Sequence, residues 1–316
     1  MAKRRLSKQQ QKRIQSAQQA SSSDENFEHG LILSHQGGQV LVETSTGSTI
    51  ECLIKSNLGN IVCGDRVAIE ETEQKEFRVV SVLPRDNLLQ RIDGFNQVRS
   101  VAANITQLII CLSVLPEPNF FLLDQYLLSA EQQGIDSIII FNKIDLDPDS
   151  THLQSLRDIY EPLGYRIIAT SIKNGIGMDE IKLALNNNRS VLSGVSGVGK
   201  SSLSNWLLPT ESIKTATISV ANAEGRHTTR SSKLYHLPDG GELIDTPGVR
   251  GFNPMRDSAL PISTGFREIQ QRAEHCKFHN CRHRIEPNCA VIDAVKAGAI
   301  SKIRYEHYLK LLEQSD

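Results

Sequence analysis

Residues 29–84 alternate apolar and polar positions in short runs. Turn-forming pairs such as Gly37-Gly38 and Gly64-Asp65 separate these runs. Alternation over a few residues is typical of strands that bury one face. The pattern predicts about five short strands, at 31–33, 39–43, 49–54, 66–70 and 77–83. Five strands of this size favour a small OB-like barrel, a fold that commonly binds nucleic acid, although a purely structural barrel fits equally well.

A different rhythm begins after Pro84, where apolar strands alternate with amphipathic helices. The predicted strands are 107–115, 136–141, 166–170, 190–193, 233–237 and 242–244. Helical periodicity covers 119–133, 149–163, 178–186 and 200–208. The first of these helices begins at the N-capping residue Asn119 and stops at Gly134. Such alternation predicts parallel β-α-β units and a doubly wound α/β sheet within residues 85–254. Beyond it, residues 255–316 hold a Cys/His cluster and then helix-like sequence from Ala290 to Glu313.

Length and composition fit a soluble chain of several domains. The 316 residues exceed one average domain, and 39% hydrophobic with 22% charged residues is typical of a globular protein. No apolar run approaches the roughly 20 residues that span a bilayer, and the N-terminus lacks an apolar leader. We therefore expect a cytoplasmic protein with no membrane partner. Three cysteines in apolar runs are expected to be reduced core residues: Cys52, Cys63 and Cys111.

The first 28 residues form a basic, polar tail, although the net charge of the chain is only −1. Before Asp24 the tail has six cations and no acid: Lys3, Arg4, Arg5, Lys8, Lys12 and Arg13. Its glutamines and serines cannot build a core, so we expect it to be disordered. A solvated tail and a nucleic-acid-binding arm both remain open.

A glycine-rich segment carries the strongest chemical signal. Its residues are Gly194-Val195-Ser196-Gly197-Val198-Gly199-Lys200-Ser201, which match G-x-x-x-x-G-K-S between a predicted strand and helix, with Ser202 next. The glycines let backbone N–H groups surround the α- and β-phosphates. Lys200 would reach the β- and γ-phosphates, and Ser201 would bind Mg²⁺. A glycine-rich turn that merely caps a helix is the alternative, and the flanking elements argue against it.

The tetrapeptide Asn142-Lys143-Ile144-Asp145 follows a predicted strand, at the sheet edge where doubly wound folds bind ligands. The Asp145 carboxylate can accept hydrogen bonds from N1–H and the 2-amino group of guanine, which adenine lacks, so it would select GTP over ATP. Lys143 is expected along the base plane, with Asn142 bracing neighbouring loops. The segment 170–173 is similar to a third base-contact loop, in which the Ser171 backbone N–H would face the guanine oxygen. In ordinary GTPases the phosphate loop comes first, so the order here indicates circular permutation.

Two further segments have the spacing of nucleotide-sensing switches. In Asp245-Thr246-Pro247-Gly248, Asp245 is expected to hold Mg²⁺ through water and the Gly248 N–H to sense the γ-phosphate. An ordinary Asp-initiated turn is the alternative. Residues 225–230 lie between the phosphate loop and this segment. One threonine there is expected to coordinate Mg²⁺, and Thr229 is favoured over Thr228, although spacing does not settle it.

Position 249 departs from the Ras-like plan. Val249 stands where those GTPases carry a water-orienting glutamine, and an aliphatic side chain cannot orient water. Either another residue does so or intrinsic hydrolysis is very slow. His227, beside the switch threonines, is a candidate, although a contact of His227 with solvent or RNA fits as well. The predicted catalytic residues are therefore Lys200, Thr229 and His227.

A close cluster of cysteine and histidine residues near the C-terminus predicts a metal site. Cys276, Cys281, Cys289 and His283 form a Cys₃His set suited to tetrahedral Zn²⁺. Three thiolates and an imidazole, with no open position, are typical of a structural site. Spacing alone leaves the imidazole ligand ambiguous, because two more histidines lie nearby, His275 and His279. Buried free cysteines are the alternative, but the polar surroundings offer no core.

Together these motifs resemble the bacterial family of circularly permuted GTPases that depend on the small ribosomal subunit, called RsgA. The resemblance covers nearly the whole chain and rests on 142–145, 194–202, 225–229, 245–250 and 276–289. It implies an N-terminal OB-fold, a permuted GTPase domain and a C-terminal zinc domain with His283 as the fourth ligand. It also implies late maturation of the small subunit, contacts to its rRNA, and hydrolysis stimulated by that subunit. Arg230 and Asn288 depart from the Thr and Gly expected there, and neither is a predicted ligand.

The sequence thus predicts a multi-domain, monomeric GTPase that binds GTP and GDP and leaves the small subunit after turnover. The predicted parts are a tail (1–28), an OB-fold barrel (29–84), a permuted α/β GTPase domain (85–254) and a mostly helical zinc domain (255–316). A nucleotide-regulated RNA-binding scaffold with negligible turnover is the second hypothesis, because Val249 makes it conceivable. A metal-delivery GTPase is disfavoured because a closed Cys₃His set would not release Zn²⁺ readily.

Overall fold

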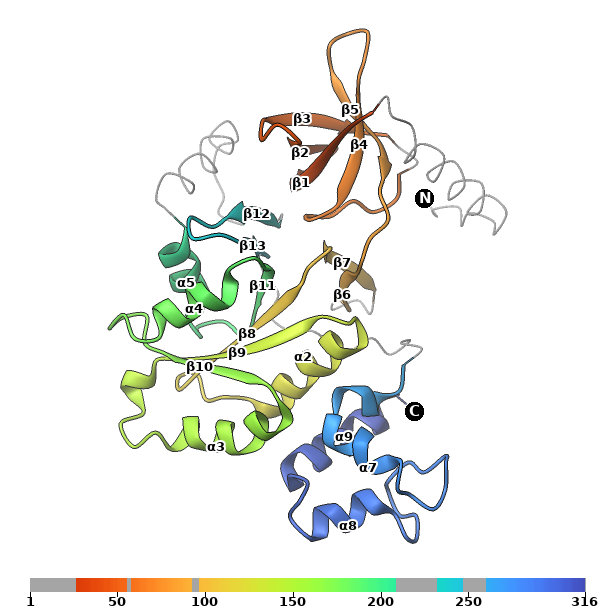
Figure 1. Ribbon diagram of the computed structural model, residues 1–316, viewed down its shortest axis with the longest axis vertical. Coiled ribbons are helices and arrows are strands. Elements are labelled where there is room, and N and C mark those ends of the chain that lie inside the picture. The colour runs from red at the N-terminus through yellow and green to blue at the C-terminus, as the bar shows by residue number, and fades with distance from the viewer. Residues whose placement is uncertain (1–26, 56–57, 93–96, 209–231, 247–259, 316) are drawn as a thin grey trace.

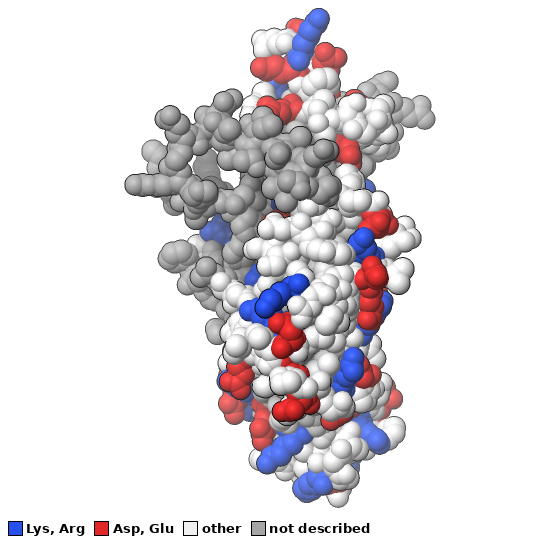
Figure 2. Space-filling model, turned by 90° about the vertical axis from the view of Figure 1, so that its left-hand side faces the viewer, with Lys and Arg blue, Asp and Glu red and all other residues white. Residues whose placement is uncertain are grey.

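Three structural parts follow one another from top to bottom in Figure 1: a β-barrel, a layered α/β region and a helical C-terminal region. The structure, a computed structural model, describes residues 27–55, 58–92, 97–208, 232–246 and 260–315. The three parts agree with the predicted fold class. Within these ranges, no helix combines the length and apolar character that crossing a bilayer requires. On the side of the molecule in Figure 2, acidic and basic side chains are interspersed, in keeping with the net charge of −1.

The N-terminal part is a closed five-stranded barrel, as the alternating pattern predicted. Its strands are β1 (Glu28–Gln36), β2 (Gln39–Thr44), β3 (Thr49–Ile54), β4 (Arg66–Glu71) and β5 (Phe77–Val82). They pair in the order β1-β2-β3-β5-β4, and a β1–β4 pairing closes the barrel. Inward-facing side chains such as Ile32, Val42 and Val79 are fully buried and fill the barrel interior.

A hairpin that the sequence pattern did not predict connects the barrel to the α/β region. Its strands are β6 (Leu88–Ile92) and β7 (Val98–Ala103), which pair in an antiparallel manner. The burial of β7 does not alternate, because its last three residues, Val101 to Ala103, are all buried. The hairpin therefore lacks the period-two signal by which the barrel strands were found.

The α/β region is built on six strands in the order β10-β9-β8-β11-β13-β12. They are β8 (Gln107–Ser113), β9 (Asp136–Asn142), β10 (Arg166–Thr170), β11 (Arg189–Ser193), β12 (Lys233–His236) and β13 (Glu242–Asp245). All neighbours are parallel except β12 and β13. Every residue of β8 is buried, as expected for a central strand covered on both faces. The predicted strands are confirmed, with ends that differ by one or two residues.

Helices cover both faces of this sheet, which confirms the doubly wound arrangement. They are α2 (Phe120–Gln132), α3 (Thr151–Tyr160), α4 (Met178–Leu185) and α5 (Lys200–Leu207). The buried side chains of α2 and α3 belong to one core cluster, and those of α4 and α5 to the cluster on the other face. Asn119 caps α2 as predicted, since its side chain accepts a hydrogen bond from the Leu122 N–H at 3.0 Å.

The C-terminal region consists of a short 3₁₀ turn, η3 (Ile262–Gly265), and the helices α7 (Arg267–Ala273), α8 (Ala290–Lys296) and α9 (Lys302–Ser315). The helix-like sequence from Ala290 to Glu313 is therefore two helices. Gly298 separates them, because its φ of +75° is a left-handed conformation that ends α8. The core of this region includes Phe266, Ile269, Val291 and Leu311.

The barrel and the α/β region are joined through their backbones as well as through side chains, such as Arg189, which donates to the Gly64 carbonyl oxygen at 3.2 Å. Strand β1 pairs with β12 at Ser34 and Lys233, so both regions contribute to one eleven-stranded sheet. Nearby, the Ala103 N–H donates to the Cys63 carbonyl oxygen at 2.9 Å. At Gly64, with φ of +85°, an added Cβ would lie 2.2 Å from the Ala103 carbonyl oxygen. We call Cys63, Gly64 and Ala103 the barrel seam.

The C-terminal region is joined to α2 by apolar packing that includes Leu128, and by buried charged side chains. The fully buried Arg304 of α9 forms ion pairs with Asp124 of α2 and with Glu268 of α7, the latter at 2.6 Å. Asp124 also contacts the Tyr160 hydroxyl at 2.9 Å and His307 Nδ1 at 2.6 Å. Burial lowers the pKa of Arg304, but the two carboxylates outweigh burial and raise it well above its usual value. We call the five residues of this polar network the C-terminal latch.

Candidate nucleotide and metal sites

The glycine-rich segment forms a tight loop between β11 and α5. Gly194, Gly197 and Gly199 have φ angles of +135°, +87° and +103°, which side-chain-bearing residues rarely adopt. At Gly194 an added Cβ would also lie 2.3 Å from the Cys111 carbonyl oxygen of β8. The loop therefore needs glycine at these positions both for its curvature and for its close approach to the sheet.

Lys200, the first residue of α5, lies within this loop. Its Nζ donates to the carbonyl oxygens of Gly194 and Val195, both at 2.7 Å. These two hydrogen bonds hold the ammonium group at the loop. A bound phosphate group would replace one or both carbonyl oxygens as its partner. Ser201 and Ser202 follow in the first turn of α5, and both are exposed. The loop backbone and a helix N-terminus thus face one anion-binding position.

The predicted guanine motif contacts the phosphate loop directly. Asn142 is buried at the end of β9, and its Nδ2 donates to the Val198 carbonyl oxygen at 2.9 Å. Lys143, with φ of +63°, donates from Nζ to the carbonyl oxygens of Gly197 at 2.6 Å and Leu115 at 2.5 Å. Two segments more than fifty residues apart in the chain therefore form one site, as the strand order requires.

The third base-contact loop completes the same edge of the sheet. The Ser171 hydroxyl donates to the Asp145 carboxylate at 2.6 Å, which fixes the orientation of the exposed carboxylate. Asn142 Oδ1 accepts hydrogen bonds from the Thr170 hydroxyl at 3.2 Å and the Ile172 N–H at 3.4 Å. The loop lies beside the guanine motif, but the Ser171 N–H donates to the Ile176 carbonyl oxygen at 3.2 Å, so its predicted contact with guanine stays a prediction. The Thr170 contact and the role of Leu115 were not predicted. Leu115 contributes only a backbone carbonyl, which leaves no signal in the sequence.

Asp245 lies at the end of β13, which β8 and β11 separate from the strand of the guanine motif, β9. Its side chain reaches solvent, yet the surrounding protein atoms raise its pKa, while nearby Lys200 acts in the opposite direction. Because β13 pairs in parallel with β11, its carboxyl end lies at the same sheet edge as the start of the phosphate loop. The other predicted switch residues lie outside the described part of the chain, so their roles remain predictions: residues 225–230, including His227, Thr228 and Thr229, together with Gly248 and Val249.

A separate metal-ligand cluster lies in the C-terminal region. Its four ligand atoms, from Cys276, Cys281, His283 and Cys289, all lie within 4.8 Å of one another. His283 Nδ1 is 3.6 Å from Cys276 Sγ and 3.4 Å from Cys289 Sγ. Within the described ranges, His275 and His279 are not part of any such cluster. The geometry thus selects His283 from the three histidines that spacing left open.

The chemistry of these side chains fits a metal ion. Burial lowers the pKa of His283, which favours the neutral imidazole that can bind a metal. Burial raises the pKa of Cys281 to about 12 without a cation, and a bound cation would reverse this by stabilising the thiolate. Supporting contacts hold the loop: the Tyr305 hydroxyl donates to the His283 carbonyl oxygen at 2.6 Å, and the Glu286 carboxylate accepts three backbone N–H groups.

Comparison with known proteins shows to which family the chain belongs. The family described as RsgA GTPase matches residues 82–254. A protein of Saccharophagus degradans named small ribosomal subunit biogenesis GTPase RsgA is 40% identical, covering 100% of this chain and 98% of that protein. The chain belongs to the RsgA GTPase family. A protein of the same name from Hahella chejuensis is 39% identical, with 99% and 97% coverage.

Solved structures related to the family agree with this fold. YjeQ from Thermotoga maritima has a TM-score of 0.73 and 32% identity, over 92% of this chain and 98% of its own. YloQ, described as a circularly permuted GTPase, has a TM-score of 0.70 and 27% identity, over 93% and 96% of the two chains. The permuted order that the sequence indicated is therefore a property shared with these structures.

Proposed function

We propose that this chain hydrolyses GTP in the cytoplasm during late maturation of the small ribosomal subunit. In this proposal it binds the rRNA of that subunit, the subunit stimulates hydrolysis, and hydrolysis leads to release. Membership of the RsgA GTPase family and the names of the full-length relatives support a GTPase of small-subunit biogenesis. The contact of Asn142 and Lys143 with the phosphate loop is the observation that carries the nucleotide site.

The proposed roles of the site residues follow from these contacts. Residues 194–199 surround the phosphates with backbone N–H groups, Lys200 neutralises the β- and γ-phosphates, and Asp145 reads guanine with support from Ser171. Mg²⁺ would be held by Ser201, Thr229 and, through water, Asp245, and when bound it offsets phosphate charge. His227 is proposed to orient the attacking water, since Val249 cannot.

The metal of the C-terminal cluster is proposed to be zinc in a structural role. Three thiolates and one imidazole are the donor set that Zn²⁺ prefers, and all four positions are taken by protein. Purified protein is expected to contain one equivalent of zinc by mass spectrometry of metals, and Cys276→Ser to lose it. Cys52→Ser, which alters a buried barrel cysteine, is the matched control. Full zinc content in Cys276→Ser would contradict the assignment.

Phosphate release from GTP, measured with small subunits, with large subunits and with neither, tests the proposed function directly. We expect multiple turnovers with small subunits and little release otherwise. Equal rates in the three mixtures would remove the ribosomal part of the proposal. Absence of turnover with small subunits would favour a nucleotide-regulated scaffold.

Asp145→Asn tests the base-reading role. The amide can no longer accept both guanine donors, so GTP affinity is expected to fall by about two orders of magnitude, a few kcal/mol. Affinity for xanthosine triphosphate, whose 2-oxo group can accept from the new amide, is expected to rise. Asp149→Asn, an exposed change nearby, serves as control. Unaltered GTP affinity in Asp145→Asn would refute the role.

A further inference from the structure

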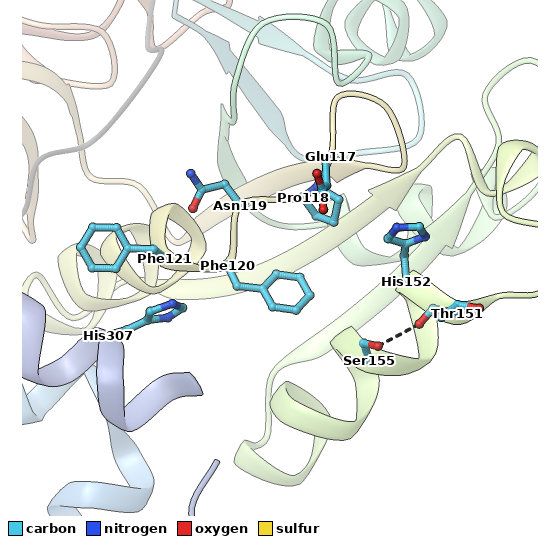
Figure 3. Close-up of a pocket in the computed structure, with 9 residues that line it drawn as sticks. All are labelled: Glu117, Pro118, Asn119, Phe120, Phe121, Thr151, His152, Ser155 and His307. Carbon is cyan, nitrogen blue, oxygen red and sulfur yellow. Dashed lines mark hydrogen bonds between the residues drawn. The ribbon is translucent and has the colours of Figure 1, made fainter. Parts of the chain in front are cut away.

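An open cavity of about 570 Å³ lies where the α/β region meets the C-terminal region, and its lining includes none of the predicted nucleotide or metal ligands. Residues 117–121, at the start of α2, form one wall, and the first turn of α3 forms the opposite wall. His307 of α9 adds a side chain from the C-terminal region (Figure 3). Pockets at such domain junctions are common places for ligands to bind.

Two histidines with fixed orientation line this cavity. His307 Nδ1 lies 2.6 Å from the Asp124 carboxylate, and His152 Nδ1 lies 3.2 Å from the Asp147 carboxylate. Because an ionised carboxylate only accepts, each Nδ1 carries the hydrogen, and Nε2 of each ring is the nitrogen that remains for a hydrogen bond with a ligand. In Figure 3 the two rings lie on opposite sides of Phe120. A ligand with hydrogen-bonding edges could therefore meet one histidine from each region.

Two aromatic rings lie beside the histidines: Phe120 lies between the two, and Phe121 lies on the other side of His307, with ring centroids 5.3 Å apart (Figure 3). Phe120 and Phe121 are both partly exposed to the cavity (Figure 3). The Lys310 ammonium lies 4.1 Å from the centre of the Phe121 ring, so a cation stands beside the aromatic surface. Aromatic rings next to a cation are typical of sites that stack bases while a neighbouring phosphate meets the charge.

Other ligand classes fit this cavity less well. Among the described residues, the Cys₃His set is the group whose donors converge on a metal position, and the cavity residues are not part of it. Glu117 lines the cavity and would repel a phosphate or carboxylate placed inside. A neutral, planar group with donors and acceptors on its edges is neither a metal ion nor an anion, and so it fits the cavity better.

We propose that this cavity binds one unstacked base of single-stranded RNA, with the adjoining phosphate near Lys310. The inference rests on the proposed function only in taking RNA as the partner. A base held there would contact α2, α3 and α9 together, so RNA would be read jointly by the GTPase region and the C-terminal region.

Photo-cross-linking of the full-length protein to short oligouridylate containing 4-thiouridine tests the proposal. Mass spectrometry then locates the cross-linked peptides. Wild-type protein is expected to cross-link at residues 117–121 or 151–155. Phe120→Leu, which keeps apolar volume but removes the ring, and His152→Gln are each expected to lower this yield about tenfold, as the loss of one stacked base does. Gln154→Ala, an exposed change on α3 outside the cavity, should leave it unchanged.

The outcomes separate this proposal from the proposed function. Cross-links confined to other regions, or cavity cross-links that both variants retain, would overturn the cavity site even if small subunits stimulate hydrolysis normally. If the variants bind small subunits more weakly but no oligonucleotide cross-links form in the cavity, the cavity would bind a protein side chain. This result would also overturn the proposed RNA site. Cavity cross-links sensitive to both variants, in a protein that small subunits do not stimulate, would support the site while refuting the ribosomal function. Circular dichroism of each variant confirms that it is folded.

Discussion

The barrel and the C-terminal region are attached to the same α/β sheet in different ways. The barrel continues the sheet through the β1–β12 pairing and places the backbone of Gly64 against that of Ala103. The C-terminal region adds no strand to the sheet within the described ranges, and it rests on α2 through the C-terminal latch. Backbone pairing depends little on side-chain identity, whereas a buried ion pair fails when one partner is lost. The two attachments should therefore respond to different kinds of substitution.

Removing the metal should give the largest contrast between the two attachments. A strong chelator, or Cys289→Ser, is expected to abolish most hydrogen-exchange protection in residues 276–289, because a bound metal would join four positions of this loop. Metal binding in small zinc peptides contributes on the order of 10 kcal/mol. Amides of β1 and β12 should keep their protection. Equal loss of protection at the barrel would contradict the independence of the two attachments.

Arg304→Met should detach the C-terminal region more gently. Asp124 and Glu268 would remain buried without their cation, at a cost of about 3–5 kcal/mol. Urea unfolding followed by hydrogen exchange of α9 measures this change. Lys302→Met, on an exposed face of the same helix, should change stability by less than about 0.5 kcal/mol. If both variants unfold alike, the latch does not hold the region.

Gly64→Ala tests the barrel seam. The added Cβ would meet the Ala103 carbonyl oxygen at 2.2 Å, in a backbone conformation that already disfavours side chains. We expect a loss of about 2–4 kcal/mol, seen as earlier thermal unfolding of the barrel. Gly47→Ala has a similar φ, +79°, but meets nothing within 4 Å, so it should cost only about 1 kcal/mol. Similar losses of stability in the two variants would show that backbone strain, and not the contact with the Ala103 carbonyl oxygen, determines the cost.

The smallest effect is expected for Glu43→Gln. Glu43 lies 2.9 Å from His236 across the junction of barrel and sheet, but the pair is exposed to solvent. Such pairs contribute about 0–1 kcal/mol, and salt screens them. Thermal unfolding at low and high ionic strength measures the difference, with the exposed Glu51→Gln as control. A loss above 2 kcal/mol would mean that side chains, too, hold the barrel.

The sequence predicted features whose signal is local. Apolar alternation located the five barrel strands, and Asn119 marked the start of α2. The nucleotide motifs were placed together because each follows a strand, and parallel strands end at one sheet edge. Their contact, between Lys143 and Gly197, is a consequence of that rule. Local chemistry at strand ends was therefore enough to predict most of the described nucleotide site.

Features that depend on distant partners were not predicted. The Arg304 side chain sits in a polar helix whose sequence suggests exposure, and only the fold brings it to Asp124. A signal did exist, since Asp124 interrupts the apolar stretch of α2, where a buried carboxylate needs a partner. The β6–β7 hairpin was missed because its burial does not alternate. Spacing could not choose among three histidines; the family resemblance implied His283, and the geometry agrees.

The shared sheet also has a mechanical consequence. If the two chain ends were pulled apart, the force would act on the β1–β12 pairing. This pairing belongs to the same hydrogen-bonded sheet as the GTPase strands. Within the described ranges, the helices of the C-terminal region form no strand pairing with the sheet, so we expect them to separate from α2 first. Barrel and GTPase region would then yield later, as a single unit under tension.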